Sequence, residues 1–173
     1  VLFAREMGVK RMVLVGGYDA WRVADLLRDR KVDVILQRVH SLPEREDDPV
    51  DLPYRLPALL KERGVRFCLS YTGDMERMGA RNLGYTAGTA RAYGLSSEDA
   101  LRAITLDAAA ILGVDKRYGS LEPGKSATLF ISDGDALDMR TSTVTEAFID
   151  GRRISLDDRQ KRLWRQYERR YAK

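Results

Sequence analysis

The sequence predicts an α/β fold in which helices cover a parallel sheet and a smaller, strand-rich segment follows. Three apolar runs at residues 11–15, 32–36 and 65–69 alternate with segments of helical periodicity. The runs lack a polar face, which is expected of strands buried on both sides of a parallel sheet. The connections suit either a barrel or a doubly wound sheet. No Gly-x-Gly-x-x-Gly motif follows any run, which counts against a dinucleotide-binding sheet.

The length and composition indicate one folded domain, or one domain and a piece of another. The 173 residues are 44% hydrophobic and 32% charged, as in an ordinary globular protein. No apolar run approaches the roughly 20 residues needed to cross a bilayer, and a net charge of +4 is too modest to favour nucleic acid. Cys68 is the single cysteine, which excludes an internal disulfide and a thiolate-rich metal site. We expect it to be a buried packing residue.

Helices and strands alternate through the first 70 residues. Residues 2–8 resemble the last turns of a helix, so we expect the chain to begin in mid-domain. Apolar residues recur at helical spacing over 19–30 and 52–63. The loop over 41–53, between the second strand and the following helix, is rich in proline and acidic residues. This order favours strands joined by helical crossovers.

Helices and then strands are predicted in the second half. Helical segments are expected over 82–93, from a cap at Ser96 or Ser97, and over 107–112. Strands are expected at two further apolar runs, and Asp150-Gly151 between the second run and Arg153 is a strong hairpin signal.

A final helix is predicted from residue 156 to about Tyr171, capped by Ser155. One face of this helix carries an apolar and aromatic stripe, and arginines and lysines occupy the rest. Two interpretations remain open: a surface helix that docks through its stripe and leaves a solvated basic face, or a helix that contacts an acidic partner.

Four linked motifs stand in one order in the chain: RNLGYTAGTA (81–90), ALRAITLDAA (100–109), GSLEPGKSATL (119–129) and DGR (150–152). This series resembles the end of the catalytic barrel in the amidohydrolase superfamily, with imidazolonepropionase-like and prolidase-like members as the nearest matches. The glycines and proline of the third motif permit tight turns and are structural. The motifs therefore indicate ancestry more directly than activity.

The resemblance implies the C-terminal part of a (β/α) TIM-type barrel, a segment of the small β-sandwich domain and a C-terminal helix. Residues 1–113 would form the barrel part, 114–154 the sandwich segment and 155–173 the helix. The three apolar runs would be strands six to eight. The remainder of the barrel would come from a missing N-terminal part, since a whole barrel takes about 250 residues.

Members of this superfamily bind one or two divalent metals after the first, fifth, sixth and eighth strands. The resemblance therefore implies a metal, with zinc as the first candidate, in the longer protein. No histidine follows the sixth-strand run, where the sequence continues Gly16-Gly17-Tyr18-Asp19. After the eighth, Asp74 is the only candidate, in a shifted register. It is either a metal ligand or proton-transfer base, or a loop carboxylate that caps a turn.

Four other residues are candidates because barrel enzymes place catalytic groups at the carboxyl ends of strands. His40, the only histidine, either contacts substrate or a proton in transit, or is structural. Arg81 and Asn82 either bind a substrate carboxylate or form a hydrogen-bond network at a helix start. Tyr71 either lines a pocket or packs in the core. The charged loop from residue 45 to residue 48 either closes over the site or stays solvated.

The expected function is metal-dependent hydrolysis of C–N bonds in cyclic amide, amide or peptide-like small substrates. The alternative is a degenerate, non-catalytic member with a binding or assembly role, because the sixth-strand histidine is missing. A third possibility, a basic partner-binding module, depends on the final helix alone. We expect no nucleic-acid or membrane partner, and a homo-oligomer is possible. The chain by itself should be inactive, and its location, cytoplasmic or exported, stays open.

Overall fold

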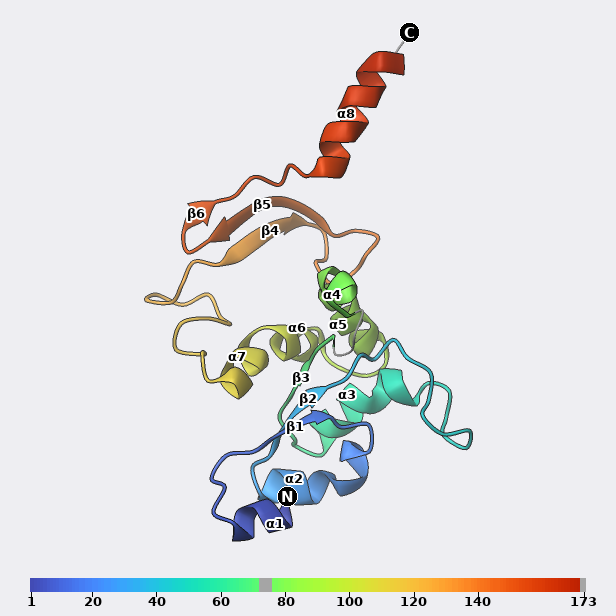
Figure 1. The fold of residues 1–173 in the computed structure, drawn as a ribbon, viewed down its shortest axis with the longest axis vertical. Coiled ribbons are helices and arrows are strands. Elements are labelled where there is room, and N and C mark those ends of the chain that lie inside the picture. Colours follow the sequence, from blue (N-terminus) through green and yellow to red (C-terminus); the bar gives the residue numbers. More distant parts are fainter. Residues whose placement is uncertain (72–75, 172–173) are drawn as a thin grey trace.

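The computed structural model describes residues 1–71 and 76–171 of the chain. It shows a mixed α/β protein with two small sheets, one near the N-terminal helices and one beneath the C-terminal helix, as Figure 1 shows. The predicted fold class is confirmed at this level. Asp74, the predicted metal ligand or proton-transfer base, lies outside the described residues.

The first sheet is parallel, as the three apolar runs predict. β1 (Val13–Gly16), β2 (Asp33–Leu36) and β3 (Phe67–Leu69) lie in the order β1-β2-β3 with parallel pairing throughout. Leu14 lies opposite Val34 in this register. The carboxyl ends of all three strands therefore meet at one edge of the sheet, which is where α/β proteins place their ligands.

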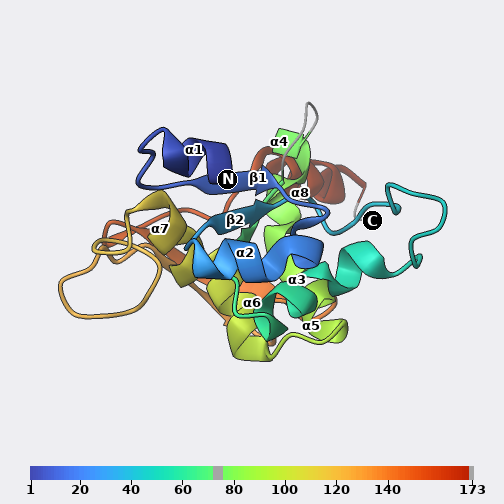
Figure 2. The ribbon, with the colours of Figure 1, turned by 90° about the horizontal axis from the view of Figure 1, so that it is seen from below.

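Helices cover one face of this sheet (Figure 2). They are α2 (Ala24–Asp29), α3 (Leu52–Glu62) and α5 (Leu83–Ala92). The core lies between them and the strands, where Leu27 and Leu60 are each no more than 1% exposed. Burying each leucine contributes roughly 1.5–3 kcal/mol. On the other face Val15 is 60% exposed, so the sheet is covered less completely there.

Shorter helices complete the first part of the fold. Their bounds are α1 (Leu2–Glu6), η1 (Ala20–Val23), α4 (Glu76–Gly79), η2 (Ala80–Asn82), α6 (Ser97–Ile104) and α7 (Leu106–Leu112). The Ser96 cap is confirmed, because its Oγ accepts the Asp99 N–H at 3.0 Å. Gly113 ends α7 with φ 75°, a conformation that glycine adopts without strain.

The second sheet is antiparallel and contains the predicted hairpin. β4 (Leu129–Asp133), β5 (Thr143–Ile149) and β6 (Arg152–Arg153) lie in that order. Asp150 and Gly151 turn the chain with φ 49° and 77°, and positive φ at both central residues is the geometry that Asp-Gly favours. The described residues form one such sheet, so the β-sandwich stays a prediction.

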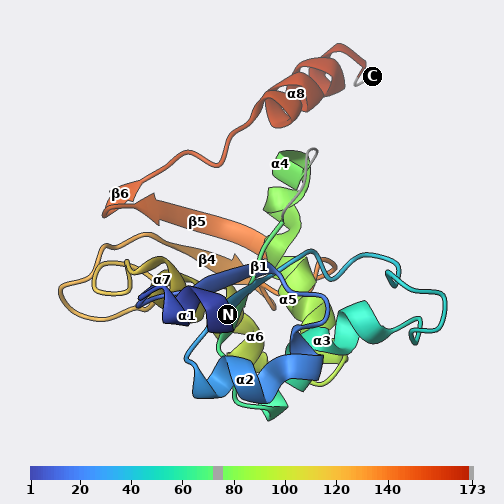
Figure 3. The ribbon, with the colours of Figure 1, turned by 60° about the horizontal axis from the view of Figure 1, so that its bottom comes forward.

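Helix α8 (Arg159–Tyr171) extends away from the rest of the molecule (Figures 1 and 3). None of its residues is buried, and Trp164 is 63% exposed. The first of the two interpretations, docking through the stripe, is therefore not seen among the described residues. The cap is also different: the Asp158 carboxylate accepts the Lys161 N–H at 2.8 Å, while Ser155 lies outside the helix. Over the described residues, no helix combines the length and apolarity that a membrane crossing needs.

Candidate functional site

The carboxyl end of β1 turns sharply at a double glycine. Gly17 has φ 67°, and a Cβ at that position would lie 2.9 Å from Cγ1 of Val34. The close approach requires glycine, because a side chain there would be both strained and too near β2. The turn directs Tyr18, which is 5% exposed, and Asp19 toward the loop that follows β2.

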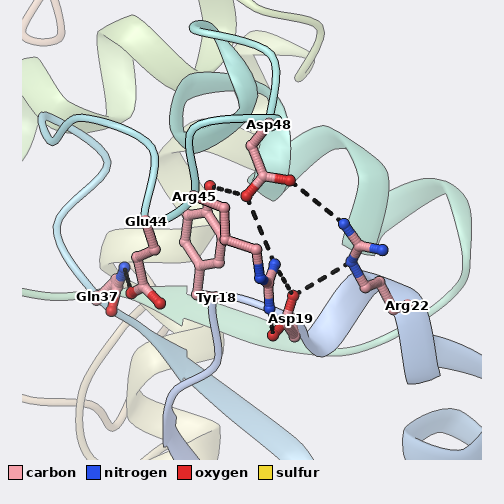
Figure 4. A network of polar contacts seen from close by, with 7 residues as sticks. All are labelled: Tyr18, Asp19, Arg22, Gln37, Glu44, Arg45 and Asp48. Carbon is pink, nitrogen blue, oxygen red and sulfur yellow. Dashed lines mark hydrogen bonds and ion pairs between the residues drawn. The ribbon is translucent and has the colours of Figure 1, made fainter.

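That loop, residues 37–51, folds back over the end of β1 (Figure 4). The side chain of Asp48 is only 4% exposed. Its Oδ2 accepts the Tyr18 hydroxyl at 2.8 Å, and its two oxygens lie 3.3 Å from Arg22 and 3.5 Å from Arg45. Asp48 is thus a buried carboxylate with a hydroxyl donor and two cations.

Asp19 lies on the other side of the same two arginines. Arg45 donates to both of its carboxylate oxygens, one of them at 2.9 Å, and Arg22 Nε lies 3.2 Å from Oδ1. The hydrogen bond from Arg45 lowers the pKa of Asp19, while burial and then the bond to Asp48 raise the pKa of Tyr18. We call these five residues the corner network. Its two carboxylates and two guanidiniums balance in charge.

His40 lies elsewhere, against helices α3 and α5. Its Nε2 is 2.7 Å from Oγ1 of Thr89, and its ring meets Tyr54 edge-on at 6.4 Å between centroids. Thr89 donates its own hydroxyl proton to the Tyr85 carbonyl at 3.1 Å. The imidazole Nε2–H is therefore the donor in the contact with Thr89, which leaves the lone pair on Nδ1.

The environment of His40 favours the neutral imidazole. Burial, followed by the positive charge of Arg38, lowers its pKa from 6.5. The residue borders a wide-open surface cavity of about 630 Å³. The cavity is lined by Arg38, His40, Ser41, Leu42, Tyr54, Thr89 and Tyr93.

The other predicted site residues lie along the segment after β3. The Tyr71 ring packs against Gly79, where an added Cβ would come within 2.5 Å of Cε1. Arg81 is exposed in η2, and the Asn82 carbonyl accepts the Thr86 hydroxyl at 3.2 Å. The Asn82 contact involves its backbone alone, and both alternatives for Tyr71, Arg81 and Asn82 stay predictions.

The family model described as "Amidohydrolase family" matches residues 27–154, which is more than half of the chain. The chain belongs to the amidohydrolase family. A search of curated proteins finds no match. Among solved structures, an amidohydrolase from Thermotoga maritima is 30% identical with a TM-score of 0.75, over 88% of this chain and 38% of that one.

More distant structures share the fold of this amidohydrolase. A prolidase complexed with N-methylphosphonate-L-proline is 18% identical, with a TM-score of 0.61 over 88% of this chain and 42% of that one. An adenosine deaminase from Xanthomonas campestris with bound zinc is 21% identical, with a TM-score of 0.60 over 98% and 45%. The chain thus spans 38% to 45% of these three structures.

The corner network of this amidohydrolase does not fit a metal centre. Within residues 1–71 and 76–171, no three His, Cys, Asp or Glu side chains are grouped so that they could hold a metal ion. Each oxygen of Asp19 and Asp48 already faces a guanidinium or a hydroxyl. A cation would have to displace these donors and would meet the two arginines.

Sequence reasoning missed the corner network as a unit. It treated Tyr18 and Asp19 only as the place where a histidine is absent, and the loop from residue 45 to 48 as a possible cover. A local signal was present, because Asp19 and Arg22, and Arg45 and Asp48, each stand three residues apart. Nothing in the sequence, however, shows that the two pairs meet across 26 residues.

Proposed function

We propose that this chain supplies the last three strands of a catalytic (β/α) barrel in a longer protein that hydrolyses C–N bonds. The observation that carries the proposal is the family match over residues 27–154 on a parallel β1-β2-β3 sheet covered by helices. The neighbouring structures are more than twice as long as the part that aligns. Residues 1–113 would belong to the barrel, 114–154 to a small sandwich domain and 155–173 to a terminal helix.

The proposed substrates are cyclic amides, amides or peptide-like small molecules. A prolidase and an adenosine deaminase among the structural neighbours agree with this class of bond. We place this protein near the imidazolonepropionase-like and prolidase-like members because of the motifs between residues 81 and 152. Arg81 and Asn82 would then bind a carboxylate of the substrate through charge-assisted hydrogen bonds.

A divalent metal, zinc first, would complete the site. When bound, such an ion activates water and polarises the scissile carbonyl. Asp74 is the ligand that this chain would contribute, or else its proton-transfer base, and the other ligands would come from the remainder of the barrel. The neutral imidazole of His40 suits a group that accepts a proton or a hydrogen bond through Nδ1.

A non-catalytic member with a binding or assembly role is the second candidate. The specific observation in its favour is the end of β1, where a paired Tyr18 and Asp19 stand in place of a histidine. Such a protein would keep the scaffold and the cavity beside His40 without the hydrolytic centre.

Metal content and turnover of the longer protein separate the two candidates. The hydrolase should retain at least one equivalent of zinc, manganese or iron per chain after gentle purification, and should cleave members of a panel of cyclic amides and dipeptides. Replacing Asp74 with Asn should then lower turnover by roughly 100-fold or more. Less than one equivalent of metal and no turnover would favour the binding role. Residues 1–173 alone should not hydrolyse the panel.

A further inference from the structure

The corner network connects segments that are distant in sequence at the edge where the site is expected. Tyr18, Asp19 and Arg22 follow β1, and Arg45 and Asp48 belong to the loop after β2. Figure 4 shows the Asp48 carboxylate between the Tyr18 hydroxyl and the two guanidiniums. Every charged member faces a member of opposite charge.

We propose that the end of β1 is an ion-paired anchor for the 37–51 loop, and that Asp19 and Asp48 are structural partners of arginine instead of metal ligands. In this protein the anchor stands where the family resemblance would place a metal-binding side chain. The loop is therefore held against β1 by the protein's own charges, with or without a metal elsewhere in the site.

Burial makes Asp48 the centre of the anchor. A carboxylate that is 4% exposed is stable as an anion only when donors replace its water shell. Tyr18 supplies a neutral donor at 2.8 Å, and Arg22 and Arg45 supply positive charge. Asp19 is about half exposed, so it contributes chiefly by orienting Arg45 through the two-point contact.

Other contacts hold the same loop at separate points. The Gln37 N–H donates to the Gly16 carbonyl at 3.0 Å, which extends the β1–β2 ladder, and Gln37 Nε2 donates to Glu44 Oε1 at 3.0 Å within the loop itself. His40 is bound to Thr89 on α5. The loop is thus attached at its start through Gln37, then through His40 and, near its end, through Asp48.

The test compares loop opening and zinc binding in the double variant Asp19→Asn/Asp48→Asn, in wild type and in the control Asp25→Asn. Asp25 pairs with Arg28 at 2.9 Å on α2, away from the loop, and is 63% exposed. Trypsin cleavage after Arg45, followed by mass spectrometry, reports opening of the loop. The double variant should be cleaved roughly 10-fold faster than wild type, because charge-assisted bonds that close the loop are lost. The control should change less than about twofold.

Equilibrium dialysis against zinc chloride supplies the second measurement. The amount of zinc bound per chain should be the same in all three proteins, including when it is zero. Loss of one zinc in the double variant alone would overturn the proposal, and so would an unchanged rate of cleavage after Arg45. Neither measurement depends on catalysis. A failure of the proposed hydrolysis can therefore be told apart from a failure of the proposed anchor.

Tyr18→Phe provides a variant for the case in which the double variant lacks the circular dichroism spectrum of the wild type. It keeps the ring and removes only the hydroxyl that donates to Asp48. Cleavage after Arg45 should then rise about threefold, since one hydrogen bond is lost. If the rate of cleavage did not rise in this variant, that result would contradict the anchor.

Discussion

The 37–51 loop meets the rest of the molecule through two regions with opposite character. At the corner network, charges are paired, and Tyr18 and Asp48 are closed off from water. Beside His40, the loop borders an open cavity of about 630 Å³, and the buried Ser41 hydroxyl has no hydrogen-bond partner among the described residues. The polar groups of the corner network all have partners, which suits a structural role. The His40 side retains polar groups without partners among the described residues and has room for a ligand.

Among the substitutions that separate the two regions, Gly17→Val should lower the free energy of unfolding most, because it disrupts the turn that leads from β1 into the corner network. Valine at φ 67° is strained, and its Cβ would lie 2.9 Å from Val34, so the free energy of unfolding should fall by about 3 kcal/mol. Urea unfolding measures the change. Gly8→Val is the matched control, because Gly8 has φ 81° with nothing within 4 Å of the added Cβ. Equal losses in the two variants would show that the close approach to β2 is unimportant.

Asp48→Ala should have the next largest effect. It leaves the buried Tyr18 hydroxyl without its acceptor at 2.8 Å and removes the carboxylate that Arg22 and Arg45 face. Because both arginines are about half exposed, water compensates them in part, and we expect a loss of about 2 kcal/mol in unfolding free energy. Asp25→Ala, at an exposed ion pair, should cost no more than about 0.5 kcal/mol. The comparison fails if the two losses are the same size.

The sequence predicts the parts of the molecule that depend on local sequence patterns. The three parallel strands follow from the apolar runs, although β1 is only partly buried, and the Asp150-Gly151 hairpin and the Ser96 cap follow from short-range chemistry. The corner network depends on a loop that returns across 26 residues, which no local periodicity encodes. The stripe of α8 is exposed among the described residues, and the sequence left both docking and a partner contact open, because an amphipathic pattern alone does not show what a helix face contacts.

On the His40 side, Thr89→Val should produce a smaller loss, about 1 kcal/mol in unfolding free energy, because the acceptor of the imidazole N–H at 2.7 Å disappears. Thr105→Val is a close control, since the Thr105 hydroxyl likewise donates to the carbonyl four residues earlier, at 2.7 Å. The difference between the two variants isolates the contact with His40. Trypsin cleavage after Arg45 should change little in Thr89→Val, because the corner network still holds that part of the loop. A large acceleration would mean that the two regions act as one.

The smallest predicted effect is a pH dependence that belongs to the His40 side alone. Burial lowers the pKa of folded His40 below 6.5, so the unfolded chain binds a proton more readily than the folded one does. The stability that comes from keeping His40 neutral is fully present above pH 6.5. It is lost as the pH falls through the pKa of His40 in the folded protein. The urea midpoint should therefore decrease from pH 7.5 to about 5.5 in wild type and decrease less in His40→Asn. Since His40 is the only histidine, identical slopes in the two proteins would place the titrating group elsewhere.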